Sequence, residues 1–391
     1  MKKIKSFFVS TVFPSLAMIF SLGFSLSPFA CSSASLGSSL EILEGDFSLP
    51  KLESFSVVSE NQLLLSFTKE ISLQNAALES EDGKQILVQN DAEKKDENSL
   101  LIEFSEATEI GKKYNFNVSV FDKNGNSVEV SINFNGYNSN PAKLIFSEIR
   151  NAYGTAKVDG NTVHKSEFAE FYVLKSGNLS GLEIYSANDG DEKKYEFPVI
   201  EVKSGDYITV HMRKINAEGL DGEGMISELE DDLTLSTHID SSKISRDLWS
   251  QNEKSVFANT DIIVLRDSSN GKILDSFLCA PSSASSWSDD EMKAFSEEVL
   301  KSGTWKDSSG EFSGNIESAV CSDNITSSAC TRSYSRQNIE ELSALYAENP
   351  ELEISSSAKD YLITADKGSG AKKIYGVTPG YKNSSNAYEA N

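Results

Sequence analysis

Residues 144–149 read LIFSEI, and residues 168–174 read FAEFYVL. Both are short runs of branched and aromatic side chains that enclose one glutamate, a pattern typical of largely buried β-strands. Similar runs follow at residues 182–185, 207–212 and 262–265, with long stretches between them. Residues 142–385 are therefore predicted to form an all-β sandwich with large insertions.

Two of the insertions are predicted to be helical. The run Ser288-Asp289-Asp290-Glu291 is a capping box with acids in the first turn, and Gly303 marks the end of the apolar helical spacing that follows it. A second helix is predicted from Gln337 to Glu348, with Pro350 beyond it. Docking of each apolar stripe onto the core of the same domain is favoured over a groove-binding role.

Residues 47–137 carry the signature of an earlier β-sandwich. Apolar residues alternate with polar ones in YNFNVSV (114–120) and VEVSINF (128–134), and Asp122–Asn126 joins these runs with an Asn-Gly pair suited to a tight hairpin. The acidic run from Asp91 to Glu97 is expected to be a solvated loop. A polar break from Gly136 to Pro141 is expected to link the two domains.

The first domain resembles the bacterial immunoglobulin-like domains of surface proteins, in its strand LLLSFTKEISL and its late hairpin. The second resembles a lamin tail domain, an immunoglobulin-like sandwich. The segments that carry this resemblance, in order, are Ser147–Ile149, Phe168–Tyr172, Leu179–Gly181, Gly205–Tyr207, the hairpin through Asp261–Leu265 and Gly271–Asp275, Ser333–Arg336, and the closing Thr378-Pro379-Gly380-Tyr381-Lys382-Asn383. The chain departs from that family at Phe168 and Leu182, where the family often has Trp. The predicted fold class is all-β, with two immunoglobulin-like sandwiches and helical insertions in the second.

The N-terminus reads as an export signal. Lys2, Lys3 and Lys5 precede an apolar segment, and residues 6–40 carry no charge. A membrane-spanning anchor is the alternative, although Pro14 and many serines interrupt the apolar run. Removing residues 1–30 would change the formal net charge from −23 to −26. Such an acidic chain without a basic cluster argues against nucleic-acid partners.

Cys31 follows Ser-Pro-Phe-Ala and precedes Ser-Ser-Ala-Ser, which resembles the lipobox of bacterial lipoproteins. The resemblance implies a lipoprotein signal peptide at residues 1–30, a diacylglycerol on the Cys31 thiol, and a serine-rich tether at residues 31–46. Pro28 stands where a lipobox has Leu, so an ordinary signal-peptidase site stays open as an alternative. An incidental cysteine is a further alternative. We expect an exported protein of the bacterial envelope, anchored by lipid at the outer membrane or surface.

Three further cysteines follow in the second domain. Cys321 and Cys330 are close enough in sequence to close a small disulfide loop after export, which would leave Cys279 unpaired. Three buried thiols are the alternative. None of the three has the paired spacing of a zinc site.

Residues 220–240 are the one carboxylate-rich stretch that could bind Ca²⁺, but they lack the alternating ligands of an EF-hand. A solvated, mobile loop is therefore favoured. His164, His211 and His238 are far apart and match no metal or triad pattern, and His211 is expected to be structural. We predict no catalytic residues, no metal and no cofactor, and the ligand is not identified.

The sequence favours a non-catalytic, membrane-anchored surface lipoprotein with a lamin-tail-like module for binding or scaffolding. Its expected partners are the membrane, through Cys31, and a protein or polysaccharide of the envelope or host. An accessory or metal-dependent hydrolase is one alternative, because bacterial lamin tail domains resemble modules attached to such enzymes. A purely structural envelope spacer is the other.

Overall fold

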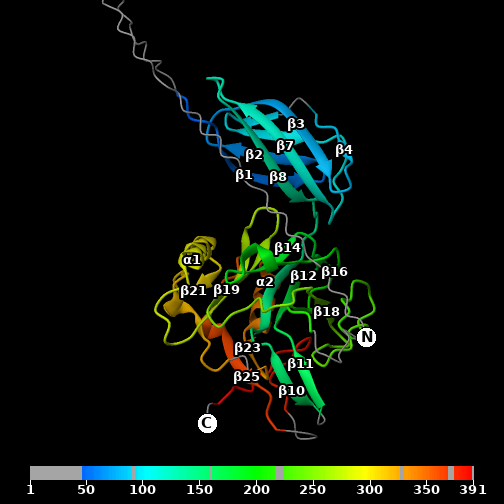
Figure 1. The fold of residues 1–391 in the computed structure, drawn as a ribbon, viewed down its shortest axis with the longest axis vertical. Helices are drawn as coiled ribbons and strands as arrows, with labels where there is room; N and C mark the ends of the chain where they lie inside the picture. The colour runs from blue at the N-terminus through cyan, green and yellow to red at the C-terminus, as the bar shows by residue number, and fades with distance from the viewer. Residues whose placement is uncertain are drawn as a thin grey trace, which may run out of the picture. The chain divides into compact units, whose positions relative to one another are not determined.

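The computed structural model describes residues 46–89, 93–158, 161–215, 224–325, 330–368 and 374–389. The segment Asp46–Asn391 is one compact unit. The predicted signal peptide, Cys31 and the tether up to residue 45 lie outside the described residues. Two successive β-sandwiches make up the described part, which confirms the predicted all-β class (Figure 1).

The first sandwich consists of two four-stranded sheets. One has the order β1-β2-β6-β5, with β1 (Leu52–Ser59), β2 (Gln62–Phe67), β6 (Ser99–Glu103) and β5 (Glu93–Asp96). The other has the order β4-β3-β7-β8, with β4 (Gln85–Ile86), β3 (Ser72–Ser80), β7 (Lys113–Phe121) and β8 (Ser127–Asn135). Both sheets contribute to one core, which extends from Leu63 to Phe134. The predicted hairpin is the β7–β8 pair, and Gly125 supplies its positive φ of 80°.

One detail of this domain differs from the prediction. The acidic run expected as a solvated loop contains strand β5, which pairs with β6 through Glu93 and Lys94. Its partner strand is mostly buried, and adding an edge strand satisfies backbone groups that β6 would otherwise leave unpaired. Residues 91 and 92 lie outside the described part.

The second sandwich has a six-stranded and a five-stranded sheet. The six-stranded order is β18 (Arg246–Trp249), β17 (Tyr207–His211), β12 (Phe168–Lys175), β9 (Lys143–Arg150), β23 (Arg332–Arg336) and β25 (Tyr361–Ala365). The five-stranded order is β15 (Tyr195–Glu196), β14 (Leu182–Ser186), β19 (Asp261–Asp267), β20 (Ile273–Ala280) and β22 (Val320–Cys321). Residues from Ala142 to Tyr361 form its core, a cluster separate from that of the first sandwich.

Shorter elements lie around these sheets. The two-stranded ladders pair β10 (Gly154–Val158) with β11 (Asn161–Lys165), β13 (Gly177–Asn178) with β16 (Glu201–Val202), and β21 (Trp305–Lys306) with β24 (Ser356–Ser357). The 3-10 turns are η1 (Gly190–Lys193), η2 (Ile316–Ser318) and η3 (Ala358–Asp360).

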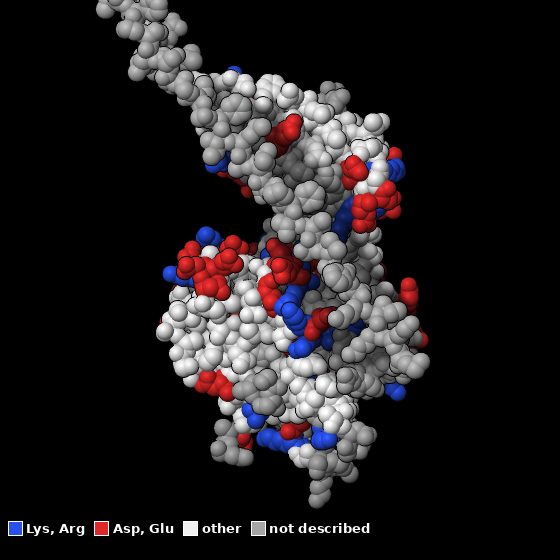
Figure 2. Space-filling model, in the orientation of Figure 1, with Lys and Arg blue, Asp and Glu red and all other residues white. Residues whose placement is uncertain are grey.

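Both predicted helices are present. Helix α1 (Asp290–Ser302) begins where the Asp289 carboxylate accepts the Met292 N–H at 2.8 Å, and it ends at Gly303 with a φ of 70°. Its apolar side joins the core of the second sandwich, with Phe295 4.9 Å from the Tyr185 ring. Its outer side carries a group of exposed acids (Figure 2). Helix α2 (Ile339–Glu348) packs on β12, as expected for an amphipathic helix.

A β-bulge in β9 decides what faces outward from the six-stranded sheet. Leu144 and Phe146 point into the core, and the pairing with β12 then shifts by one residue at Ser147. Because side chains alternate along a strand, the extra residue sends Ile149 into the core and Glu148 to the opposite face. That opposite face is not exposed: α2 packs on β12, and the chain's last described segment reaches Glu148 and Glu170.

Candidate functional site

A row of polar side chains crosses the outer face of the six-stranded sheet. Successive cross-strand partners are Asp247 (β18), Thr209 (β17), Glu170 (β12), Glu148 (β9) and Ser335 (β23). All five are fully buried. Like-charged residues directly opposite each other in antiparallel strands are destabilising, so this glutamate pair must be held by its surroundings.

The closing segment from Thr378 to Asn383 supplies much of that support. The Thr378 N–H lies 3.1 Å and 3.2 Å from the two carboxylate oxygens of Glu148, and the Thr378 hydroxyl donates to one of them at 3.0 Å. The Gly380 N–H donates to Glu170. The Asn383 amide donates to the carbonyls of Ser147 at 2.9 Å and Arg336 at 2.8 Å. The C-terminal turn therefore closes the domain on its first strand.

Hydroxyl groups complete the hydrogen bonding of the two glutamates. Ser333 donates to Glu148, and Ser147 donates to Glu170 at 2.8 Å. Burial raises the pKa of Glu148 to about 7. Burial, and then the neighbouring Glu148 carboxylate, raise the pKa of Glu170 well above its ordinary value of 4.5. The pair therefore holds at least one proton in the folded protein near neutral pH.

Gly380 has a conformation that the closing turn requires. Its φ is +81°, which L-residues rarely adopt, and a Cβ at this position would lie 2.1 Å from the Ser245 hydroxyl and 2.4 Å from Ser242 Cβ. The absence of a side chain lets its N–H approach Glu170. The glycine of the Thr-Pro-Gly pattern is thus a packing requirement at this site.

Next to this row lies a buried ionic cluster. The Asp240 carboxylate pairs with the Arg150 guanidinium at 2.5 Å through one oxygen and with the Lys165 ammonium at 2.8 Å through the other. Burial alone would raise the pKa of Asp240, but the two cations outweigh it and hold that pKa well below its usual range. The three charges sum to +1, within a chain whose net charge is −23.

Two histidines lie against Trp249. His211 is buried, its Nε2 is 2.8 Å from an Asp247 oxygen, and its ring stacks on Trp249 with centroids 3.9 Å apart. His238 donates from Nε2 to the His164 carbonyl at 3.0 Å, and its Nδ1 accepts the Asp240 N–H at 3.2 Å. Burial lowers the pKa of His238 to about 4, so it is neutral near pH 7. His211 therefore packs inside the fold at the end of β17, and its structural role stays a prediction.

The carboxylate-rich stretch agrees in part with its prediction, because Glu230, Asp231 and Asp232 are exposed outside any helix or strand. Its described residues begin at 224. Glu228 and Asp240 are buried instead of solvated, and Glu228 accepts the N–H groups of Ser236 at 3.1 Å and Asp247 at 2.8 Å. These acids have partners inside the fold, so they do not need solvent. Among the described residues, no three histidine, cysteine, aspartate or glutamate side chains gather as a set that could hold a metal ion.

The predicted disulfide is not formed in the structure. Cys321 and Cys330 are both free thiols, as is Cys279. Cys321 is exposed on β22, whereas Cys330 is buried with its sulfur 3.4 Å from the Thr155 carbonyl. The alternative of three buried thiols holds for Cys279 and Cys330 but is wrong for Cys321. Closeness in sequence therefore did not bring these two thiols into bonding geometry.

A cavity of about 490 Å³ opens beside the closing turn. We call it the tyrosine pocket, and its lining residues are Lys165, Ile239, Asp240, Ser241, Asp366, Tyr375, Val377, Thr378, Pro379 and Tyr381. Tyr375 is 62% exposed and Tyr381 is 47% exposed. No sequence motif marks Lys165, Asp366 or Tyr375, because nothing local indicates that these positions share a cavity.

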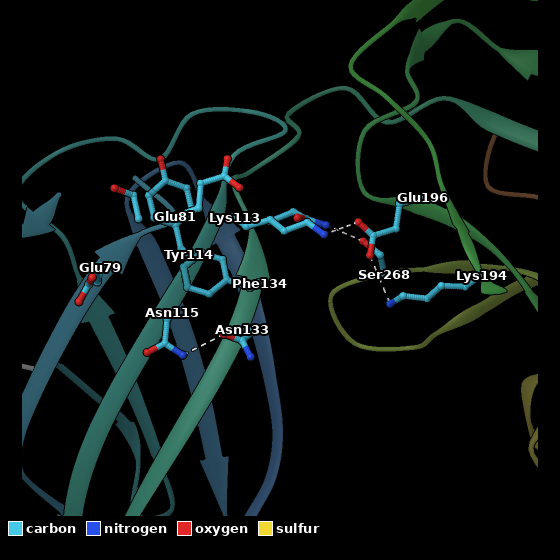
Figure 3. A pocket seen from close by; sticks show the side chains of 12 residues that line it. Glu79, Glu81, Lys113, Tyr114, Asn115, Asn133, Phe134, Lys194, Glu196 and Ser268 are labelled. Atoms are coloured by element: carbon cyan, nitrogen blue, oxygen red, sulfur yellow. Dashed lines mark hydrogen bonds and ion pairs between the residues drawn. The ribbon is translucent and has the colours of Figure 1, made fainter. Parts of the chain in front are cut away.

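A larger cavity, of about 610 Å³, is lined mainly by polar groups that are bonded to one another (Figure 3). The Glu196 carboxylate forms ion pairs with Lys113 at 2.5 Å and with Lys194 at 3.3 Å. The Asn115 side-chain amide donates a hydrogen bond to the Asn133 side-chain oxygen at 2.8 Å. These side chains already have partners. The tyrosine pocket gathers three exposed large side chains, Tyr375, Tyr381 and Ile239, and is the better candidate for a ligand site.

Comparison with known proteins places the second domain in a family. A family model described as a protein second domain matches residues 142–363, more than half of the chain. The chain belongs to this family. The match begins where the sequence predicts the second domain to begin.

A relative and two solved structures are also similar to the chain. An uncharacterized protein from Treponema pallidum (strain Nichols) is 30% identical over 264 residues, which cover 64% of this chain and 62% of that protein. A DUF4876 family protein from Bacteroides thetaiotaomicron is 12% identical and covers 68% of this chain and 83% of its own, with a TM-score of 0.26. The N-terminal part of the bacterial S-layer protein SbsC is 16% identical and covers 41% of this chain and 40% of its own, with a TM-score of 0.23. Scores this low carry no argument about function.

Proposed function

We propose that the protein is a non-catalytic lipoprotein of the bacterial envelope, and that its second domain is a binding or scaffolding module. The lipid anchor at Cys31 is supported by the signal-like residues 1–30 and by the lipobox resemblance. In the described part of the chain, no helix is long and apolar enough to cross a membrane. The lamin tail resemblance stays a prediction.

The burial and hydrogen bonding of the Glu148 and Glu170 carboxylates support a non-catalytic role for the protein. Paired carboxylates with a raised pKa are what an acid–base enzyme would need. A general acid or base must come within hydrogen-bond reach of its substrate. Here both carboxylates are fully buried and accept hydrogen bonds from Thr378, Gly380 and nearby hydroxyls. The chain thus uses these two acids to close the domain.

The single observation that carries the binding proposal is the tyrosine pocket beside this closed row. It is open, it has apolar and hydrogen-bonding walls, and its size of about 490 Å³ falls within the range of roughly 300–1,000 Å³ common for ligand sites. The closing turn forms one wall through Thr378 and Pro379, and the glutamates hold that turn in place. A wall fixed in this way is preorganised for binding.

Detergent-phase partition of the full chain tests the anchor. We expect the wild type to enter the detergent phase and Cys31→Ser to stay in the aqueous phase. Cys321→Ser is the matched control, because it removes the exposed thiol of the second domain and should partition like the wild type. Equal aqueous partition of the wild type and Cys31→Ser would exclude the lipid anchor.

A binding module and a structural spacer differ in their response to a change in the pocket. Cell-envelope and host-matrix extracts are passed over immobilised wild type and Tyr375→Ala. A component retained by the wild type and released by the variant supports a binding module. Identical retention profiles for the two proteins favour the spacer.

A further inference from the structure

We propose that the tyrosine pocket binds a neutral carbohydrate. This inference rests on the proposed function, because it names the ligand class of the same module. It depends on three features of the pocket: its aromatic mouth, its hydrogen-bonding floor and its balance of charge.

The mouth is formed by large side chains that a folded protein usually covers. Tyr375, Tyr381 and Ile239 are 62%, 47% and 41% exposed, and all three line the same cavity. A tyrosine ring offers a flat apolar face and a polar hydroxyl at its tip. A sugar ring has the matching combination, with C–H groups on its faces and hydroxyls at its edge. Exposed apolar side chains that gather in this way mark interaction sites.

The floor offers hydrogen-bond donors from a fixed position. Lys165 is buried, and its ammonium donates to Asp240 at 2.8 Å. An ammonium carries three donors, and among the described residues Asp240 is the one acceptor bonded to it. The remaining donors suit hydroxyl oxygens of a ligand. Ser241 and Thr378 add hydroxyl groups to the same lining.

The charge balance of the pocket favours a neutral ligand over an anionic one. Lys165 and Arg150 share the Asp240 carboxylate, so these three groups together carry +1. Asp366 adds a further carboxylate to the lining. The chain as a whole carries a net charge of −23, which repels anions at long range. A neutral sugar needs no compensating charge and can use the hydroxyl and ammonium donors directly.

The pocket walls come from segments that are anchored elsewhere. Thr378 is held by Glu148, and Asp240 is held by two buried cations. The Asp366 carboxylate accepts the N–H of Gly376 at 3.0 Å, next to Tyr375 in the chain. Binding therefore requires little ordering of the backbone, which favours measurable affinity for a small ligand.

The test is a titration of the full chain in detergent, with three neutral oligosaccharides as probes: chitotriose, maltotriose and cellotriose. Saturation-transfer NMR and calorimetry measure binding. We expect saturable binding of at least one probe with a dissociation constant on the order of 1 mM or tighter. Tyr375→Ala and Tyr381→Ala should each weaken it about tenfold. Tyr375→Phe should weaken it less, because the ring is kept.

Phe47→Ala is the matched control, since it removes an exposed aromatic ring outside the pocket and should leave affinity unchanged. Circular dichroism confirms that each variant is folded. The inference is overturned if no neutral probe binds, or if binding is equal in the wild type and both alanine variants. Tyrosine-dependent binding of only trigalacturonate or of an acidic peptide also overturns it. A wild type that enters the detergent phase but binds no sugar refutes this inference alone and leaves the proposed function standing.

Discussion

Replacing Glu148 with glutamine should change how the stability of the second domain depends on pH. The pKa of Glu148 is about 7 in the folded protein, against 4.5 for an ordinary glutamate. The folded state therefore binds this proton more tightly than the unfolded state does. Stability must then fall as the pH rises from 4.5 through 7, and this contribution becomes constant above that range.

The magnitude follows from the same difference. Each pKa unit is worth roughly 1.4 kcal/mol, so the wild type should lose about 3 kcal/mol of unfolding free energy through Glu148 alone. The glutamine side chain that replaces it cannot ionise and resembles the protonated acid. The Ser333 and Thr378 hydroxyls can rotate to accept from its amide. The variant should therefore gain about 3 kcal/mol relative to the wild type between low and neutral pH.

Other groups titrate in the same range, so the difference between variant and wild type is the informative quantity. The pKa of Asp261 is raised by burial to about 7 and acts in the same direction as Glu148. The pKa of His238 is lowered by burial to about 4, so its contribution to stability rises with pH up to its ordinary value of 6.5. Both groups are present in both proteins, and their effects cancel in the difference. The effect of Glu170 does not cancel, because the Glu148 carboxylate contributes to raising its pKa; the glutamine variant loses that contribution, which acts in the same direction as the loss of Glu148 itself.

The assay is urea unfolding followed by tryptophan fluorescence at pH values from about 4.5 to about 8. All three tryptophans, Trp249, Trp287 and Trp305, lie in the second domain, so the signal reports that domain. Glu341→Gln on the exposed side of α2 is the control for loss of one formal charge. A variant-minus-wild-type difference that stays constant across the pH range would refute the assignment of a buried, protonated Glu148.

Three further predictions concern packing and charge. Gly380→Ala should destabilise the second domain by more than about 2 kcal/mol, roughly the combined cost of overpacking and backbone strain. Gly205→Ala is the control: Gly205 has a φ of 96° but open space around its Cβ, so this change should cost only about 1 kcal/mol. Urea unfolding of the two variants measures both costs. Asp240→Asn should lower the free energy of unfolding by about 3–5 kcal/mol, because it leaves the buried Arg150 and Lys165 without their carboxylate. A loss of under a few degrees in Tm would contradict the buried cluster. Phe116→Ala should lower the stability of the first sandwich by about 3–5 kcal/mol and leave the tryptophan-detected transition unchanged; calorimetry resolves the two transitions.

Local signals allowed much of the fold to be predicted from sequence. The hairpin at Asp122–Asn126 and helix α1 depend on neighbouring residues: an Asn-Gly pair in one case, and Asp289 and Gly303 in the other. The alternation of apolar and polar residues along β2 and β7 likewise indicates that each strand has one buried face. Each of these features is encoded within about ten residues of where it occurs.

The site was less predictable because its contacts are distant in sequence. Glu148 and Glu170 were visible as acids inside apolar strands, but their burial depends on Thr378, which is 230 positions from Glu148. Asp240 was expected in solvent because a lone carboxylate usually is, and its cations Arg150 and Lys165 lie 90 and 75 positions away. The bulge at Ser147 has no sequence signal such as glycine, so the face that Glu148 occupies could not be inferred.

The closing turn also bears on the order in which the protein is assembled. The first sandwich has all its strands once residue 135 has been synthesised, whereas the second domain pairs its first strand with a segment made more than 200 residues later. Contacts this far apart are slow to form, and domains synthesised first generally fold first. A chain that stops before Thr378 would leave two buried glutamates without their backbone donors. Synthesis through the closing turn is thus coupled to stability, and chains that stop before it should be unstable and readily degraded.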